Sequence, residues 1–138
     1  MSISCPLCEN DGGQVVWRNE LARVVLADEP NYPGFCRVIL HRHQAEMTDL
    51  TVEERSQLMA IVWAVETCVR NTLKPTKINL ASLGNMVPHL HWHIIPRWQD
   101  DLHFPAPVWA NAEPSRQIHQ VPAAQLQQLR FQLEQLKP

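Results

Sequence analysis

The sequence predicts a single domain that combines short strands with two helices. Its 138 residues fall within the usual size range of one domain, and 45% of them are hydrophobic, which suffices for a core without disulfide bonds. Three observations support this class of fold. Short runs of β-branched residues lie between turn-forming residues, one long capped helix occupies the middle of the chain, and a proline-rich stretch precedes a last helix.

Three strands are predicted in the first 40 residues. Residues 14–18 and 23–27 are rich in valine, and the short polar segment between them predicts a hairpin. Residues 28–34 concentrate Asp, Pro, Asn and Gly, which are typical of a loop. The apolar pattern resumes over residues 35–40, which we predict to be the third strand.

The best-defined helix begins after Thr51, which forms a capping-box pattern with Glu54. Apolar residues then recur at spacings of three and four, which places them on one stripe of a helix. Pro75 is expected to end the helix. The stripe consists of Leu58, Val62, Val65 and Val69.

The second half of the chain predicts two more strands and a final helix. Residues 78–80, followed by Leu83, favour a fourth strand, and residues 89–95 a fifth. Between residues 98 and 120 several prolines exclude long regular elements, so this segment is expected to be an extended arm. The last helix starts near Pro122 and carries a stripe of leucines that predicts a core or dimer contact: Leu126, Leu129, Leu133 and Leu136.

Composition excludes several classes of function. Twelve basic and fourteen acidic residues give a net charge of −2, which disfavours a nucleic-acid-binding protein. No apolar stretch reaches ~20 residues, which predicts that the protein does not span a membrane. A secretory signal is also absent, so we expect the protein in the cytoplasm. In that reducing compartment the four cysteines, Cys5, Cys8, Cys36 and Cys68, are expected to be thiols or metal ligands.

Three histidines alternate with apolar residues in the segment from His89 to Ile95. In a strand this alternation places His89, His91 and His93 on one face and the apolar residues in the core. A helix would turn the middle imidazole away from the other two. The strand interpretation is therefore favoured.

Three neighbouring imidazoles are compatible with three kinds of role. A neutral ring can attack phosphorus through Nε2 while cationic neighbours stabilise phosphate oxygens and protonate the leaving oxygen. The same alternation can bind zinc from a strand. The rings can also be hydrogen-bonded structural residues of a half-buried sheet.

The run His89-Leu90-His91-Trp92-His93-Ile94-Ile95, with His43 upstream and a capped helix between them, resembles the signature of the histidine triad superfamily of nucleotidyl hydrolases and transferases. The resemblance implies an α+β fold with a five-stranded antiparallel sheet, one long helix and a C-terminal helix. It also implies a homodimer with a ten-stranded sheet. We therefore expect one domain over residues 1–138, with a core at 5–97 and a C-terminal arm and helix at 98–138.

The resemblance also implies the chemistry. His91 would attack an α-phosphate and form a covalent nucleotidyl-histidine, His93 would lie near the leaving oxygen, and His89 and His43 would support the site. The substrate would be a nucleoside phosphoramidate or a dinucleoside polyphosphate with an AMP-type purine nucleotide, and the chemistry would need no cofactor. Competing hypotheses are a zinc-dependent hydrolase that uses these histidines as metal ligands and a nucleotide-binding module without catalysis.

Other residues are candidates for contacts with the substrate. By resemblance, Asp28 would accept hydrogen bonds from ribose hydroxyls. Asn79 and Asn85 flank the turn before the histidine run, where their amides could donate to phosphate oxygens. The chain has Gly84-Asn85-Met86-Val87 where the family often has Gly-Gln-Ser/Thr-Val. Arg97 is expected either to meet distal phosphates or, in the simpler interpretation, to be exposed.

Cys5 and Cys8 form a C-x-x-C pair, which is half of a zinc site. The resemblance supplies His43 and His89 as the other two ligands of a structural zinc. Two free thiols are the main alternative. A redox pair is disfavoured because such a motif normally follows a strand, and only four residues precede Cys5.

Overall fold

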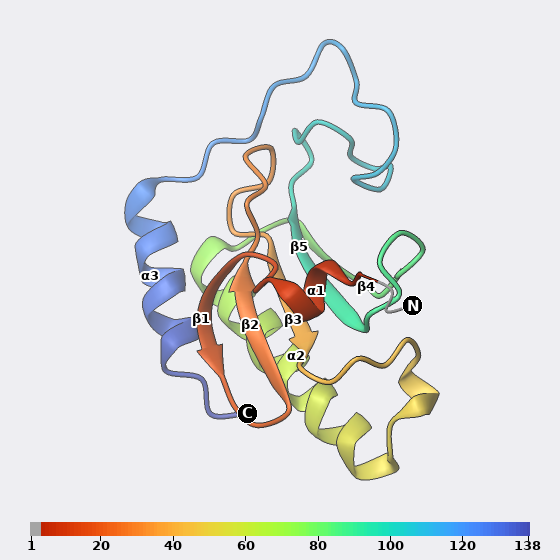
Figure 1. Cartoon of the computed structure of the whole chain (residues 1–138). Coiled ribbons are helices and arrows are strands. Elements are labelled where there is room, and N and C mark those ends of the chain that lie inside the picture. Colours follow the sequence, from red (N-terminus) through yellow and green to blue (C-terminus); the bar gives the residue numbers. More distant parts are fainter. Residues whose placement is uncertain (1–3) are drawn as a thin grey trace.

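The computed structural model describes residues 4–138, in which five strands and three α-helices form one α+β unit (Figure 1). The predicted strands and helices are all present, with ends shifted by one or two residues. Their bounds are α1 Pro6–Glu9, β1 Gln14–Arg18, β2 Ala22–Leu26, β3 Cys36–Leu40, the 3₁₀ turn Met47–Asp49, α2 Val52–Leu73, β4 Lys77–Ala81, β5 His91–Arg97 and α3 Ala123–Glu134.

The sheet is antiparallel and has the order β1-β2-β3-β5-β4. The first three strands follow one another as neighbours, and α2 then carries the chain to the far edge. β5 returns between β4 and β3. The expectation of a five-stranded antiparallel sheet is confirmed, and the histidine-bearing strand is an inner one, paired on both sides.

Helices α2 and α3 cover one face of the sheet (Figure 1). The Thr51–Glu54 capping box begins α2, and the four residues of its predicted stripe are buried. The helix ends at Leu73, because Lys74 adopts a left-handed conformation with φ of 49° just before Pro75. Leu129 and Leu133 of α3 complete this core.

Helix α1 lies on the opposite face, where a buried arginine holds it (Figure 1). Arg23 donates from Nε to the carbonyl of Asp11 at 2.9 Å and from Nη2 to the carbonyls of Leu7 at 2.8 Å and Asn10 at 3.1 Å. Gly12 is needed here, because a Cβ on it would lie 2.8 Å from Ile39 Cδ1. The segment that carries the C-x-x-C pair is thus fixed against the sheet.

Among residues 4–138, no helix is both long and apolar enough to cross a bilayer.

Candidate functional site

Strand β5 places His91 and His93 on the face of the sheet opposite α2, with their ring centroids 4.9 Å apart. Trp92 and Ile94 point to the other face, as the alternation predicted. His89 departs from the prediction, because the strand begins only at His91. The strand therefore carries two of the three imidazoles, and the ring of His89 is fully buried beside His43 instead.

The backbone of His89 orients His91. Nδ1 of His91 lies 2.6 Å from the carbonyl oxygen of His89. Because a carbonyl only accepts, Nδ1 carries the proton and a neutral His91 has its lone pair on Nε2. Ser82 donates to the carbonyl of His91 at 2.9 Å, which ties the preceding loop to the strand at the same residue. His91 is partly accessible, as a nucleophile requires.

His93 is held as a neutral ring. Arg37, in β3, donates from Nε to Nδ1 of His93 at 3.3 Å. Burial, together with the nearby His91 and Arg37, lowers the pKa of His93 to about 4. At neutral pH this residue is uncharged, which corrects the expectation of a cationic neighbour for His91 from this position.

Cys5, Cys8, His43 and His89 meet in one cluster, with one ligand atom of each within 4.8 Å of the others. Nδ1 of His89 lies 3.4 Å from Cys5 Sγ, 3.5 Å from Cys8 Sγ and 3.2 Å from His43 Nδ1. Zinc bonds of ~2.0–2.3 Å in a tetrahedron separate the ligand atoms by about 3.3–3.8 Å. The spacing and the donor set therefore fit a single zinc ion.

The tautomer of His89 also fits a metal ligand. Its Nε2 lies 2.6 Å from the carbonyl of Leu40, so the proton is on Nε2 and the lone pair of Nδ1 points into the cluster. Burial lowers the pKa of His89, which favours this neutral form. His89 thus connects two parts of the site: its ring belongs to the cluster, and its backbone carbonyl accepts a hydrogen bond from Nδ1 of His91.

The three candidate substrate contacts differ in their settings. Asp28 is exposed in the loop after β2, and Asn85 is exposed in the loop before β5. Asn79 pairs with Ile95, so its side chain shares the face of His93. Its amide oxygen accepts from Arg97 Nη1 at 2.8 Å, which leaves the amide nitrogen as the donor that could meet a phosphate.

A cavity of about 420 Å³ opens beside His93. Its walls are mainly apolar and come from the loop before β3, from β5 and from the C-terminal arm, including Tyr32, Phe35, Ile95, Val108 and Trp109. A cavity of this kind suits a flat aromatic group next to the imidazoles. The sequence alone does not reveal this cavity, because its walls come from segments far apart in the chain.

Sequence analysis also missed Arg37. A signal was present: a charged residue interrupts the otherwise apolar run of residues 35–40. In a strand buried on both faces, such a residue requires a partner.

The comparison with known proteins agrees with this geometry. A model of the HIT domain matches residues 9–100. The chain belongs to the HIT domain family. A histidine triad protein from Bradyrhizobium japonicum is 30% identical, with a TM-score of 0.75, and the match covers 97% of this chain and 96% of that one.

Two further proteins are similar to this chain. An "AP-4-A phosphorylase" from Mycobacterium tuberculosis is 32% identical over 105 residues, which is 72% of this chain and 54% of the relative, so the chain spans about half the length of this curated relative. A zinc-bound histidine triad family protein from Mycobacterium smegmatis shares the fold at 21% identity, with a TM-score of 0.65 and coverage of 96% and 94%.

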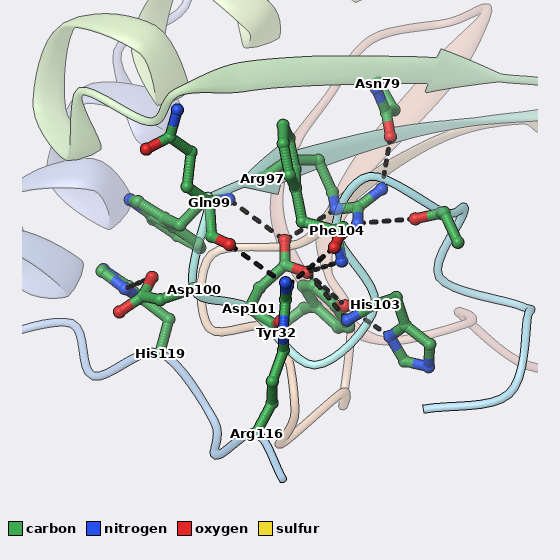
Figure 2. Close-up of polar contacts among 12 residues, drawn as sticks. Tyr32, Asn79, Arg97, Gln99, Asp100, Asp101, His103, Phe104, Arg116 and His119 are labelled. Atoms are coloured by element: carbon green, nitrogen blue, oxygen red, sulfur yellow. Dashed lines mark hydrogen bonds and ion pairs between the residues drawn. The ribbon is translucent and has the colours of Figure 1, made fainter. Parts of the chain in front are cut away.

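The HIT domain match ends near residue 100, where a buried polar network ties the arm to the sheet (Figure 2). Arg97 is only 2% exposed and donates to Asp101 from Nε at 2.8 Å and from Nη2 at 3.1 Å. It also donates to the carbonyl of Ala106 at 2.7 Å. Both expectations for Arg97 are therefore wrong, because it is neither exposed nor free for distal phosphates.

Asp101 is the centre of this network (Figure 2). Burial alone would raise the pKa of Asp101, but hydrogen bonds from Arg97 and from the backbone amides of His103, Trp98 and Phe104 hold it well below its usual range. Tyr32, which lines the cavity, donates to the same carboxylate at 3.2 Å. The network thus fixes the arm that forms one wall of the cavity.

Replacing Asp101 with asparagine is expected to destabilise the HIT domain by about 3–5 kcal/mol at pH 7, because it leaves the buried cation of Arg97 unpaired. The folded-state pKa of Asp101 is depressed, so its contribution is present above the unfolded pKa of ~3.9 and is lost as pH falls further. Urea unfolding at pH 7 and at pH 3 checks this. The difference in the free energy of unfolding between wild type and Asp101→Asn should be smaller at pH 3 than at pH 7. The control Asp100→Asn, at a neighbouring exposed carboxylate, should have the same free energy of unfolding as wild type.

Proposed function

We propose that this chain is a nucleotide hydrolase or nucleotidyl transferase that cleaves a nucleoside phosphoramidate or a dinucleoside polyphosphate at the α-phosphate through a nucleotidyl-His91 intermediate. The hydrogen bond from Nδ1 of His91 to the carbonyl of His89 carries the proposal, since it leaves the Nε2 lone pair for phosphorus. The name of the Mycobacterium tuberculosis relative supports a substrate with phosphoric anhydride bonds.

In the first step Nε2 of His91 bonds to the α-phosphorus, and the bond from phosphorus to the leaving group breaks with its electron pair on the leaving atom. Nδ1 keeps its proton throughout, and this N–H donates a hydrogen bond to the carbonyl of His89. In the second step water bonds to phosphorus, the phosphorus–nitrogen bond breaks, and its electron pair returns to Nε2. The water proton passes to solvent, and AMP is released.

The surrounding residues take supporting roles in the same proposal. His93 donates from Nε2 to the leaving atom, and Asp28 accepts from the ribose. Asn79 and Asn85 donate to phosphate oxygens. The cavity beside His93 holds the purine base, because its apolar walls and size suit a flat ring.

Cys5, Cys8, His43 and His89 would hold a zinc ion in a structural role, as the distances and the donor set support. Such an ion neutralises the thiolates and fixes His89. Four protein ligands complete a tetrahedron and leave no position for water, which argues against the zinc-dependent hydrolase. His91 and His93 are not among these four groups.

Trapping tests the proposal. The chain is incubated with diadenosine tetraphosphate, quenched in alkali and measured by intact-protein mass spectrometry. One added adenylyl group on His91 is expected, because phosphorus–nitrogen adducts survive alkali. Binding of AMP without an adduct or turnover would instead support a non-catalytic nucleotide-binding module. The predicted homodimer is measured by light scattering on the native chain before the quench.

A further inference from the structure

Arg37 lies directly opposite His93 in the pairing of β3 with β5. Its guanidinium is held on several sides. Nε donates to Nδ1 of His93 at 3.3 Å, Nη1 donates to the carbonyl of Gly12 at 3.4 Å, and the carbon Cζ lies 5.2 Å from the ring centre of Phe35. Arg37 is therefore a fixed cation beside His93, and both residues line the cavity.

The direction of the hydrogen bond determines the tautomer of His93. A guanidinium only donates, so Nδ1 of His93 must offer its lone pair, and the proton of the neutral ring is on Nε2. A second proton on Nδ1 would break this bond and place two cations side by side. Arg37 thus opposes the imidazolium form by geometry as well as by charge.

The other charged and titratable groups around His93 do not replace this effect. His91 is its neighbour in β5, and Glu29 and His103 line the same cavity from the loop after β2 and from the arm. Burial lowers the pKa of Arg37, and the negative charge of Glu29 opposes that shift. The guanidinium therefore stays charged beside His93.

We propose that Arg37 is a positioning residue that keeps His93 neutral with its proton on Nε2, and that the guanidinium, held at Nδ1 of the same ring, supplies near the leaving group the positive charge that an imidazolium would otherwise supply. The inference rests on the proposed function and narrows it. The site is then suited to leaving groups that depart as anions.

The two substrate classes differ in this respect. When His91 displaces a polyphosphate, the phosphorus–oxygen bond breaks and the electron pair stays on an oxygen that is stable as an anion, since its conjugate acid has a pKa of ~6. That oxygen needs a hydrogen bond and a nearby cation. When His91 displaces an amine, the departing nitrogen must gain a proton, and a neutral imidazole N–H is too weak an acid to give it. Anhydrides are therefore preferred over phosphoramidates.

The first test measures His93 directly. Nitrogen-15 NMR of the imidazoles, assigned with His93→Gln, is recorded from pH 3.5 to 8 for wild type, Arg37→Met, Arg37→Lys and the control Arg130→Met, at a partly exposed arginine of α3. Wild type and the control should show the Nε2–H form of His93 with a midpoint near pH 4. In Arg37→Met, His93 should populate both neutral tautomers, and its titration midpoint should lie at a higher pH. Arg37→Lys should shift the tautomer ratio and the midpoint part of the way back to the wild-type values. Arg37→Gln serves as a second neutral variant if Arg37→Met does not fold.

The second test compares kcat on diadenosine tetraphosphate with kcat on adenosine phosphoramidate. Arg37→Met should lower the first about 10²-fold and the second by no more than about 3-fold. Equal losses on both substrates, or a His93 that titrates alike in wild type and Arg37→Met, would overturn the role of Arg37. A wild-type chain that turns over neither substrate would overturn the proposed function instead, and the NMR result would still decide whether Arg37 sets the state of His93.

Discussion

Replacing His91 with alanine is expected to lower kcat/KM for diadenosine tetraphosphate by at least about 10³-fold, because the variant lacks the imidazole that the proposed function makes the nucleophile. The cost to folding should be small, since His91 is partly exposed and its Nδ1 bonds only the carbonyl of His89. Steady-state kinetics and the alkali-stable adduct measure the effect together. Both should disappear while the melting temperature stays close to that of wild type.

Two matched variants test whether the loss of activity is specific to the proposed nucleophile or follows the removal of any histidine. His93→Ala should lower kcat less than His91→Ala and should still form the adduct, because Nε2 of His91 remains available. His119→Ala removes an arm histidine that stacks on Trp98 and pairs with Asp100, and it should leave kcat unchanged. A His91→Ala chain that keeps more than about a tenth of wild-type kcat/KM would contradict covalent catalysis at this residue.

Local patterns predicted most of the elements because each pattern has a short-range cause. The Thr51–Glu54 capping box, the stripe of α2 and the alternation around His91 depend on neighbours within a few residues, and all three are present as expected. His89 shows where this reasoning stops. Alternation alone extends the strand to His89, whereas the buried ring is fixed by Leu40 and by cysteines about eighty residues away in the sequence.

The burial of arginines, and the partners that they contact, could not be predicted from the sequence. Arg97 lies just beyond the predicted strand and is its last residue in the structure, and its partners are Asn79 in another strand and Asp101 in an arm without regular structure. Arg23 and Arg37 likewise find backbone carbonyls or an imidazole only in the folded chain. An arginine is buried only when such partners converge, and that convergence is a property of the topology.

Removing Cys5 and Cys8, the proposed zinc ligands of the N-terminal segment, is expected to have a large effect on stability. Purified wild type should contain one zinc per chain, and the double variant Cys5→Ser/Cys8→Ser should contain none, because two ligands from the histidines alone hold zinc weakly. With free zinc at 100 to 1,000 times its Kd, the wild type gains about 3–4 kcal/mol, which corresponds to a difference in Tm of roughly 10–20 °C. Metal analysis and calorimetry measure these two quantities.

Cys68→Ser is the matched control, since this thiol lies in α2 and outside the cluster, and it should keep both the zinc and the Tm. The double variant should also lose kcat, because His89 without its partners no longer fixes the carbonyl that orients His91. Chelation of wild type should reproduce the loss of stability, and added zinc should reverse it. A double variant with unchanged zinc content would contradict the assignment of the ligands, whereas a zinc-free variant with wild-type kcat would show that His91 is oriented without the metal.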